Sequence, residues 1–188
     1  MYFAIQDHGL GIDKTTAMSI MSVYGALIYM SSIPGGWIAD RITGTRGATL
    51  IGGVLIIIGH ICLSLPFAMF GLFTSMFFII IGSGLMKPNI SNIVGRLYPQ
   101  NDVRMDAGFV IFYMSVNFGA LVSPIILQHF INVKNFHGGF LIAAIGMALG
   151  LIWYILFNRK NLGSVGMKPT NPLSPTEKKK YSIIIAAI

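Results

Sequence analysis

The chain alternates between long apolar runs and short polar segments. A helix needs about 20 predominantly apolar residues to cross the hydrocarbon core of a bilayer. Runs of that length predict spanning helices near residues 15–39, 48–70, 72–94, 107–130 and 139–157. Residues 1–6 are expected to end a preceding helix, and residues 181–188 to begin a further one. The pattern therefore predicts an all-α transmembrane bundle over residues 1–160 and a linker over residues 161–180, truncated at both ends.

Composition places this bundle in a membrane. Of the 188 residues, 54% are hydrophobic and 10% are charged, whereas soluble domains carry about 25% charged residues. We therefore expect an integral, multi-pass protein of the cell membrane. The net charge of +7 does not indicate nucleic-acid binding, because most basic residues lie in short segments between apolar runs. The sequence has no metal-ligand cluster, no phosphate-binding glycine loop and no paired intramembrane carboxylates, so neither an enzyme nor a cofactor is expected.

Lysines and arginines concentrate on one side of the predicted bundle. If the spans alternate in direction, ten of them share a side, and the positive-inside rule makes that side cytoplasmic. These are Arg41, Arg46, Arg96, Arg104, Arg159, Lys160, Lys168, Lys178, Lys179 and Lys180. Lys14 and Lys134 lie on the opposite side. Residues 161–180 would then be a cytoplasmic linker, and a break after six helices suggests one half of a two-bundle transporter.

A single charge interrupts the run from residue 72 to 94. Lys87 is followed by Pro88, which removes a backbone donor and predicts a kink or an opening of the helix. A charge near mid-bilayer costs about 2.5–3.5 kcal/mol on insertion scales, so Lys87 is expected to face a partner or a wet cavity. Gly82 and Gly84 would let another helix approach closely. The alternative is a lysine that snorkels near a helix end.

The loop between the second and third predicted spans combines glycines with charged residues. Its distinctive positions are Gly35, Gly36, Asp40, Arg41, Gly44 and Arg46. The two glycines that precede the charges would allow close helix contact. The carboxylate can pair with an arginine or cap the next helix. We expect this loop to latch the cytoplasmic ends of neighbouring helices; a topology anchor with a tight turn is the alternative.

Three polar side chains lie at a similar depth in their spans. Tyr29 is about 14 and Lys87 about 15 residues from the outside, and Asn117 about 10 from the inside, so all three lie near the midplane at 1.5 Å per residue. Transporters place substrate there. A lysine suits a carboxylate, and tyrosine and asparagine can hydrogen-bond to peptide amides. Contacts between helices are the alternative for Tyr29 and Asn117. His60 is expected to be neutral and bonded to a neighbour rather than a proton carrier.

Several stretches resemble motifs of one family. Residues 35–46 resemble the loop between helices two and three of the major facilitator superfamily, with a longer spacing similar to that of its proton-coupled oligopeptide transporter branch. Residues 84–90 look like the fourth-helix motif of that branch. Residues 112–121 look like its fifth-helix signature, Phe-Tyr-x-x-x-Asn-x-Gly-x-Leu, and residues 163–180 like the linker of its bacterial members. The family's first-helix motif Glu-x-x-Glu-Arg is missing and is expected upstream of Met1.

The resemblance implies a major-facilitator-type bundle, of which this chain forms most of the N-terminal half. It implies proton-coupled uptake of di- and tripeptides by alternating access, with Tyr29, Lys87 and Asn117 binding substrate. Lys87 would also take part in proton coupling by attracting a peptide or coupling carboxylate. The implied partners are small peptides, protons, the lipid bilayer and the C-terminal half of the same transporter. A carrier for another small solute, such as nitrate or a drug, and a non-transporting membrane sensor are the alternatives.

Overall fold

The computed structural model describes residues 11–99, 101–133, 135–174 and 176–177, and all the regular elements among them are helical. In chain order they are α1 (Lys14–Met30), α2 (Ser32–Ile38), the π-helical turn η1 (Ala39–Thr43), α3 (Gly44–Ser64), α4 (Ala68–Arg96), α5 (Arg104–Asn132) and α6 (Phe136–Leu162). The helix ends expected at residues 1–6 and 181–188, and the sides assigned to Lys134 and to residues 178–180, lie outside the described residues.

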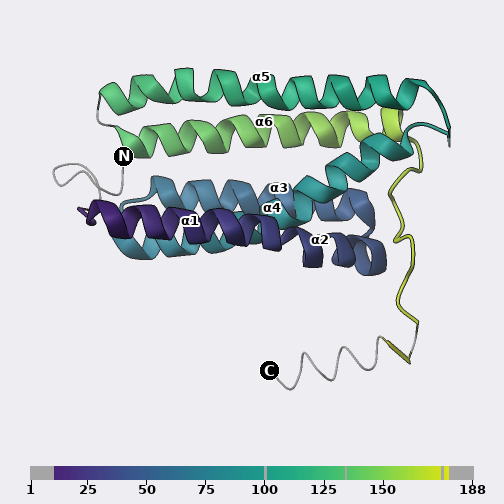
Figure 1. Cartoon of the computed structure of the whole chain (residues 1–188), viewed down its shortest axis with the longest axis horizontal. Helices are drawn as coiled ribbons and strands as arrows, with labels where there is room; N and C mark the ends of the chain where they lie inside the picture. The colour runs from purple at the N-terminus through teal and green to yellow at the C-terminus, as the bar shows by residue number, and fades with distance from the viewer. Residues whose placement is uncertain (1–10, 100, 134, 175, 178–188) are drawn as a thin grey trace.

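The helices run back and forth along one direction. In Figure 1, α1 and α2 run from left to right, α3 returns, and α4, α5 and α6 continue the alternation. Three connections therefore meet at the right-hand end: η1, the link between α4 and α5, and the exit of α6 into residues 163–177. We call this the basic end, because Arg41, Arg96 and Arg159 lie at or beside these connections. The alternation on which the predicted orientation depends is confirmed for these residues.

Four helical runs among the described residues are long and apolar enough to cross a membrane: Lys14–Ser64, Ala68–Arg96, Arg104–Phe130 and Phe136–Leu162. The first run holds two of the predicted spans, because only Ser31 separates α1 from α2, and η1 leads directly into α3. The chain reverses within this run at Gly44, whose φ is +75°. Helices therefore cover all five predicted ranges, whereas their number as separate membrane crossings stays a prediction. The assignment of residues 161–180 as a linker between two halves stays a prediction.

The predicted span over residues 15–39 is not one continuous helix. α1 ends at Met30, and α2 begins at Ser32. Pro34 explains the interruption, because its ring clashes with the carbonyl four residues earlier, at Met30, and offers that carbonyl no N–H donor.

The predicted boundary between the third and fourth spans is also wrong. The pattern extends the third span to residue 70 and starts the fourth at residue 72, whereas α3 ends at Ser64 and α4 begins at Ala68. Leu65 is extended, with ψ of 149°. Pro66 is the cause, because a proline disfavours the helical conformation of the residue before it.

Pro88 does not open α4. The helix continues through it from Ala68 to Arg96. Figure 1 shows the C-terminal part of α4 leaving the direction of its N-terminal part, so the helix bends without breaking. The neighbouring Asn89 is 2% exposed, and its Nδ2 donates to the carbonyls of Leu85 (2.6 Å) and Gly35 (3.3 Å). Asn89 thereby ties α4 to α2.

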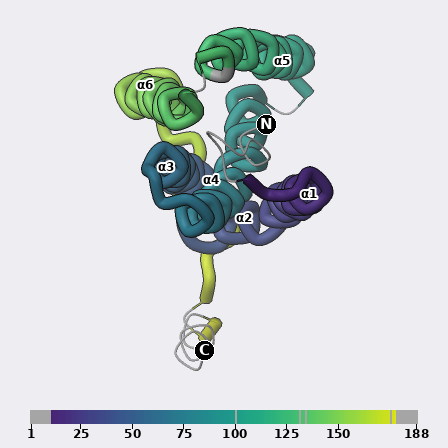
Figure 2. Tube along the Cα trace, turned by 90° about the vertical axis from the view of Figure 1, so that its left-hand side faces the viewer, coloured from purple at the N-terminus to yellow at the C-terminus, as the bar shows by residue number. Residues whose placement is uncertain are grey.

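Glycines set the closest helix contacts. α4 lies between α1 and α3 in Figure 2. A Cβ on Gly35 would overlap the backbone carbonyl of Gly84, and a Cβ on Gly82 would lie 2.7 Å from the carbonyl oxygen of Gly52. The predicted close approach is therefore confirmed for Gly35, Gly82 and Gly84. It is wrong for Gly36, which has open space beside it in the described part of the chain.

Candidate functional site

α1 and α4 bring two of the three predicted substrate residues together. The Nζ atom of Lys87 lies 5.4 Å from the centroid of the Tyr29 ring. Cation–π attraction at such a distance contributes about 0.5–1 kcal/mol at exposed sites and about 2 kcal/mol when water is excluded. Both side chains are exposed in this chain, Tyr29 to 76%. The contact between Gly35 of α2 and Gly84 of α4 lies within two helical turns of both residues, and it packs the helix that directly follows α1 against α4.

Asn117 lies apart from that pair. It is exposed on α5, and its Nδ2 donates to the carbonyl of Tyr113 in the same helix (2.8 Å). Figures 1 and 2 both show α5 beside α6 and apart from α1. Within the described residues, no hydrogen bond or ring contact joins Asn117 to Tyr29 or Lys87. The cavity shared by the three residues stays a prediction.

His60 lies half-buried in α3. Its Nδ1 atom is buried and finds no hydrogen-bond partner among the described residues. The expected bond to a neighbour is therefore not made at this nitrogen.

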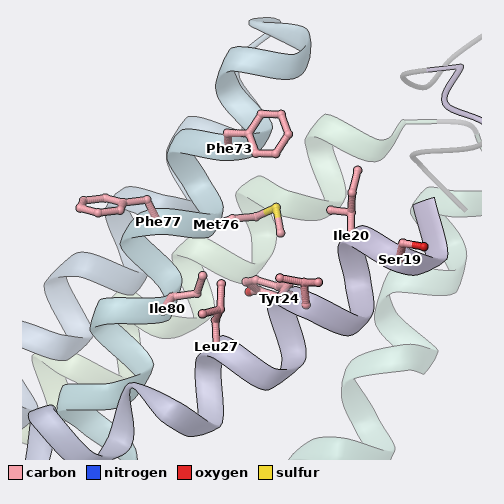
Figure 3. Close-up of a pocket in the computed structure, with 9 residues that line it drawn as sticks. Ser19, Ile20, Tyr24, Leu27, Phe73, Met76, Phe77 and Ile80 are labelled. Carbon is pink, nitrogen blue, oxygen red and sulfur yellow. The ribbon is translucent and has the colours of Figure 1, made fainter. Parts of the chain in front are cut away.

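A cavity of about 430 Å³ opens between α1 and α4, toward the end of the bundle opposite the basic end. Figure 3 shows Tyr24 and Leu27 of α1 facing Met76 and Ile80 of α4 across the space where the two helices diverge. The lining includes no charged side chain. This cavity suits an apolar group and offers no counter-charge to an amine or a carboxylate. Tyr24 forms part of its wall.

Asp40 forms the predicted carboxylate–arginine pair at the basic end. The Nη2 atom of Arg96, at the end of α4, lies 3.8 Å from Oδ1 of Asp40. Thr170 bridges the pair, because its hydroxyl accepts from Arg96 Nη2 (2.7 Å) and donates to Asp40 Oδ1 (3.3 Å). The backbone N–H of Asn171 also donates to the backbone carbonyl of Asp40 (2.9 Å). The η1 turn is thus connected to α4 and to the segment after α6.

Arg41 pairs with a different carboxylate. Its Nη2 donates to Oε1 of Glu177, and its Nη1 donates to the carbonyl of Asn171 (3.3 Å). The backbone N–H of Leu173 donates to the Arg41 carbonyl (3.3 Å). Hydrogen bonds with the backbone and side chain of Ser174, together with the charge of Arg41, lower the pKa of Glu177. Glu177 therefore keeps its charge to a lower pH than an ordinary glutamate.

Arg46 is buried beneath the segment after α6, at 6% exposure. Its backbone N–H donates to the carbonyl of Gly166 (3.0 Å), and its Nη2 donates to the carbonyl of Gly163 (2.9 Å). Gly44 makes the turn into α3 at a positive φ that glycine adopts without strain. The segment closes directly over this turn, because a Cβ on Gly166 would overlap Oγ1 of Thr45. Among the described residues, no carboxylate forms a salt bridge with Arg46.

Sequence reasoning missed three residues that connect these elements. Glu177 is the only glutamate in the chain and the only acid within residues 161–180, so a lone carboxylate in a basic linker was an available signal. Thr170 offers no such signal, because its partners lie 74 and 130 residues earlier in the chain. Asn89 is a polar residue in an apolar run, which was an available signal. Sequence reasoning singles out only the charged Lys87 among the polar residues of that run as a candidate site residue.

Comparisons with known proteins agree with this architecture. A crystal structure of a POT family transporter in complex with 5-aminolevulinic acid is 86% identical, has a TM-score of 0.95, and is matched over 100% of this chain and 38% of that chain. The uncharacterized transporter YclF of Bacillus subtilis strain 168 is 49% identical over 174 residues, which are 93% of this chain and 35% of the relative. The di-/tripeptide transporter of Lactococcus lactis subsp. cremoris is 43% identical over 180 residues, or 96% of this chain and 36% of the relative.

The match identifies the family as well as the fold. The chain spans about a third of the length of these curated relatives. The expected all-helical, major-facilitator-type fold and multi-pass membrane location are confirmed by the described helices and the similar structure. Residues 47–178, well over half of the chain, match the model of the POT family (PTR2). This chain therefore belongs to the POT family, whose members are transporters and not enzymes.

Proposed function

We propose that the chain forms most of the N-terminal half of a secondary transporter that takes up di- and tripeptides together with protons. In this proposal Tyr29, Lys87 and Asn117 line the substrate cavity, and the C-terminal half of the transporter closes it. The Lactococcus lactis relative is a di-/tripeptide transporter, which supports the peptide substrate. Proton coupling fits the family to which the chain belongs.

The observation that carries the proposal is the ammonium of Lys87 over the ring of Tyr29. Lys87 lies nine residues before Arg96, the last residue of α4, or about 14 Å along the helix at 1.5 Å per residue. Bringing a charge to that depth is costly unless a partner, water or substrate meets it. A peptide carboxylate is such a partner. A coupling carboxylate from another helix is a second one, and exchange between the two would link substrate binding to protonation.

Uptake of a labelled dipeptide is the direct test. We expect proteoliposomes that contain the full-length parent transporter to accumulate dipeptide under an inward proton gradient, and unlabelled dialanine to compete. Equilibration at the same rate with and without the gradient would exclude symport. Dipeptide binding without any flux would instead identify a sensor on the same fold.

A second candidate function is uptake of another small solute. It is favoured by one observation: the transporter that is 86% identical was solved in complex with 5-aminolevulinic acid. The same uptake assay separates the two, with labelled 5-aminolevulinic acid as substrate and dialanine as competitor. Uptake of that acid without competition by dialanine would favour the second function.

The place of Asn117 in the cavity is tested by cysteine protection. We expect a cysteine introduced at Asn117, with Lys87 intact and Cys62 replaced, to react with a water-soluble thiol reagent and to be protected by dipeptide. The matched control is Ser115→Cys, because two residues turn an α-helix by about 200° and place this position on another face of α5. It should show no protection. If Asn117→Cys is unreactive in every state, the site consists of Tyr29 and Lys87 without Asn117.

A further inference from the structure

The segment after α6 is held against the basic end at three separate places. We call this segment, residues 163–174 and 176–177, the strap. Its first part lies on the start of α3, where Gly163 and Gly166 accept hydrogen bonds from Arg46. Its middle reaches Asp40 and Arg96 through Thr170. Its last part reaches Arg41 through Glu177. The strap therefore crosses the ends of η1, α3 and α4.

The strap completes the electrostatic surroundings of both charged residues of η1. Asp40 has Arg96 at 3.8 Å, and the hydroxyl of Thr170 between them supplies the shorter bonds of 2.7 and 3.3 Å. Arg41 finds its carboxylate only on the strap, at Glu177, among the described residues. Without the strap, Asp40 keeps a long ion pair, and Arg41 has no paired carboxylate in the described part of the chain.

We propose that Thr170 and Glu177 are positioning residues of the transporter, which set the place of Asp40 and Arg41 at the basic end and thereby the rate of its opening and closing. This inference rests on the proposed transport function. Neither residue touches Lys87 or Tyr29, so they act on the conformational step and not on substrate binding. Such steps limit the turnover of many proteins that open and close around a ligand.

The strap is held in a way that allows it to release. The contact at Arg46 is buried, but the contacts through Thr170 and Glu177 involve partly exposed charges: the side chains of Arg41 and Glu177 are 18% and 39% exposed, and those of Arg96 and Asp40 are 33% and 48% exposed. Such pairs are weak individually, and segments held mainly by exposed polar contacts open at low cost. Release would uncover Thr45, which is 1% exposed with the strap in place.

Thr45 gives a readout that needs no substrate. Gly166 lies directly on it, so a cysteine at position 45 reacts with a water-soluble maleimide only when the strap lifts. We expect Thr45→Cys, in the full-length parent without other reactive cysteines, to be labelled slowly. Adding Glu177→Gln or Thr170→Val should speed labelling about twofold to fivefold, which is the change expected from losing one partly exposed polar pair. The two changes combined should approach about tenfold if they act independently.

The matched control is Asp106→Asn. Asp106 is an exposed carboxylate in the first turn of α5, near the same end of the bundle, and it forms no ion pair among the described residues. This variant removes the same charge as Glu177→Gln and should leave the labelling of Thr45→Cys unchanged. Thr170→Ser keeps the bridging hydroxyl and should restore slow labelling.

Measurements of dipeptide uptake distinguish a positioning role of Thr170 and Glu177 from a purely structural one. We expect Glu177→Gln and Thr170→Val to change the maximal rate of dipeptide uptake about twofold to fivefold at unchanged KM, while Thr170→Ser behaves as the parent. Unchanged labelling in the combined variant, or faster labelling with an unchanged maximal rate, would overturn the proposal. If the parent itself takes up no peptide, the proposed function fails, whereas the labelling rates still decide whether these residues hold the strap.

Discussion

Replacing Lys87 with alanine should abolish proton-driven dipeptide uptake while leaving the amount of folded transporter near that of the parent. The variant removes a charge that is costly at this depth, so the helix does not depend on it for stability. It also removes the ammonium that lies over Tyr29 and that we propose attracts the substrate or coupling carboxylate. Uptake by proteoliposomes under an inward proton gradient, normalised to purified protein, measures the effect. Normal driven uptake would remove Lys87 from the mechanism.

Two conservative variants separate charge from geometry. Lys87→Arg keeps the positive charge, but it should also fail, because a planar guanidinium fork does not replace a compact ammonium. Tyr29→Phe keeps the aromatic face and should preserve the cation–π contact, whereas Tyr29→Leu should lose it. If Tyr29→Phe raises KM as much as Tyr29→Leu does, the hydroxyl binds the substrate and the ring contact is secondary.

The spans were predictable because hydrophobic length alone decides whether a segment can cross a membrane. The errors lie where a proline acts on a neighbour within an apolar run. Pro66 and Pro34 interrupt helices that the apolar pattern reads as continuous, since apolarity does not report the loss of a backbone donor. Pro88 shows the reverse, because α4 continues through it. Packing by the neighbouring helices therefore decides whether a helix breaks at a proline or only bends.

The sequence predicts how deep each candidate site residue lies in its span, but not which way its side chain points. Counting residues along each span places Tyr29, Lys87 and Asn117 at one level, and the contact between the first two agrees with that count. Depth does not tell which way a helix is rotated, however, so Asn117 could not be assigned from the sequence. The partners of Asp40 and Arg41 on the strap, Thr170 and Glu177, lie 130 and 136 residues away. No local pattern encodes a contact over that separation; only the folded path of the strap brings these side chains together.

The second large effect is expected from one added methyl group at Gly35. A Cβ at this position would overlap the backbone carbonyl of Gly84, and a backbone carbonyl cannot rotate aside as a side chain does. Overpacking a core typically costs about 1–3 kcal/mol, and we expect Gly35→Ala to reach or exceed the upper end of that range. Separation of α2 from α4 would also lengthen the 3.3 Å hydrogen bond from Asn89 to the Gly35 carbonyl. The measurement is the thermal unfolding midpoint of the purified full-length transporter.

Gly36→Ala is the matched control, because it makes the same chemical change one residue later in the same helix. Gly36 has nothing within 4 Å of its added Cβ in the described residues, and alanine is favoured over glycine inside a helix by about 1 kcal/mol. The control should therefore unfold at or above the temperature of the parent, and Gly35→Ala well below it. Equal midpoints for the two variants would contradict the close approach of α2 and α4. Gly35 follows Tyr29 by six residues and Gly84 precedes Lys87 by three, so we expect that separating α2 from α4 in Gly35→Ala also weakens dipeptide binding.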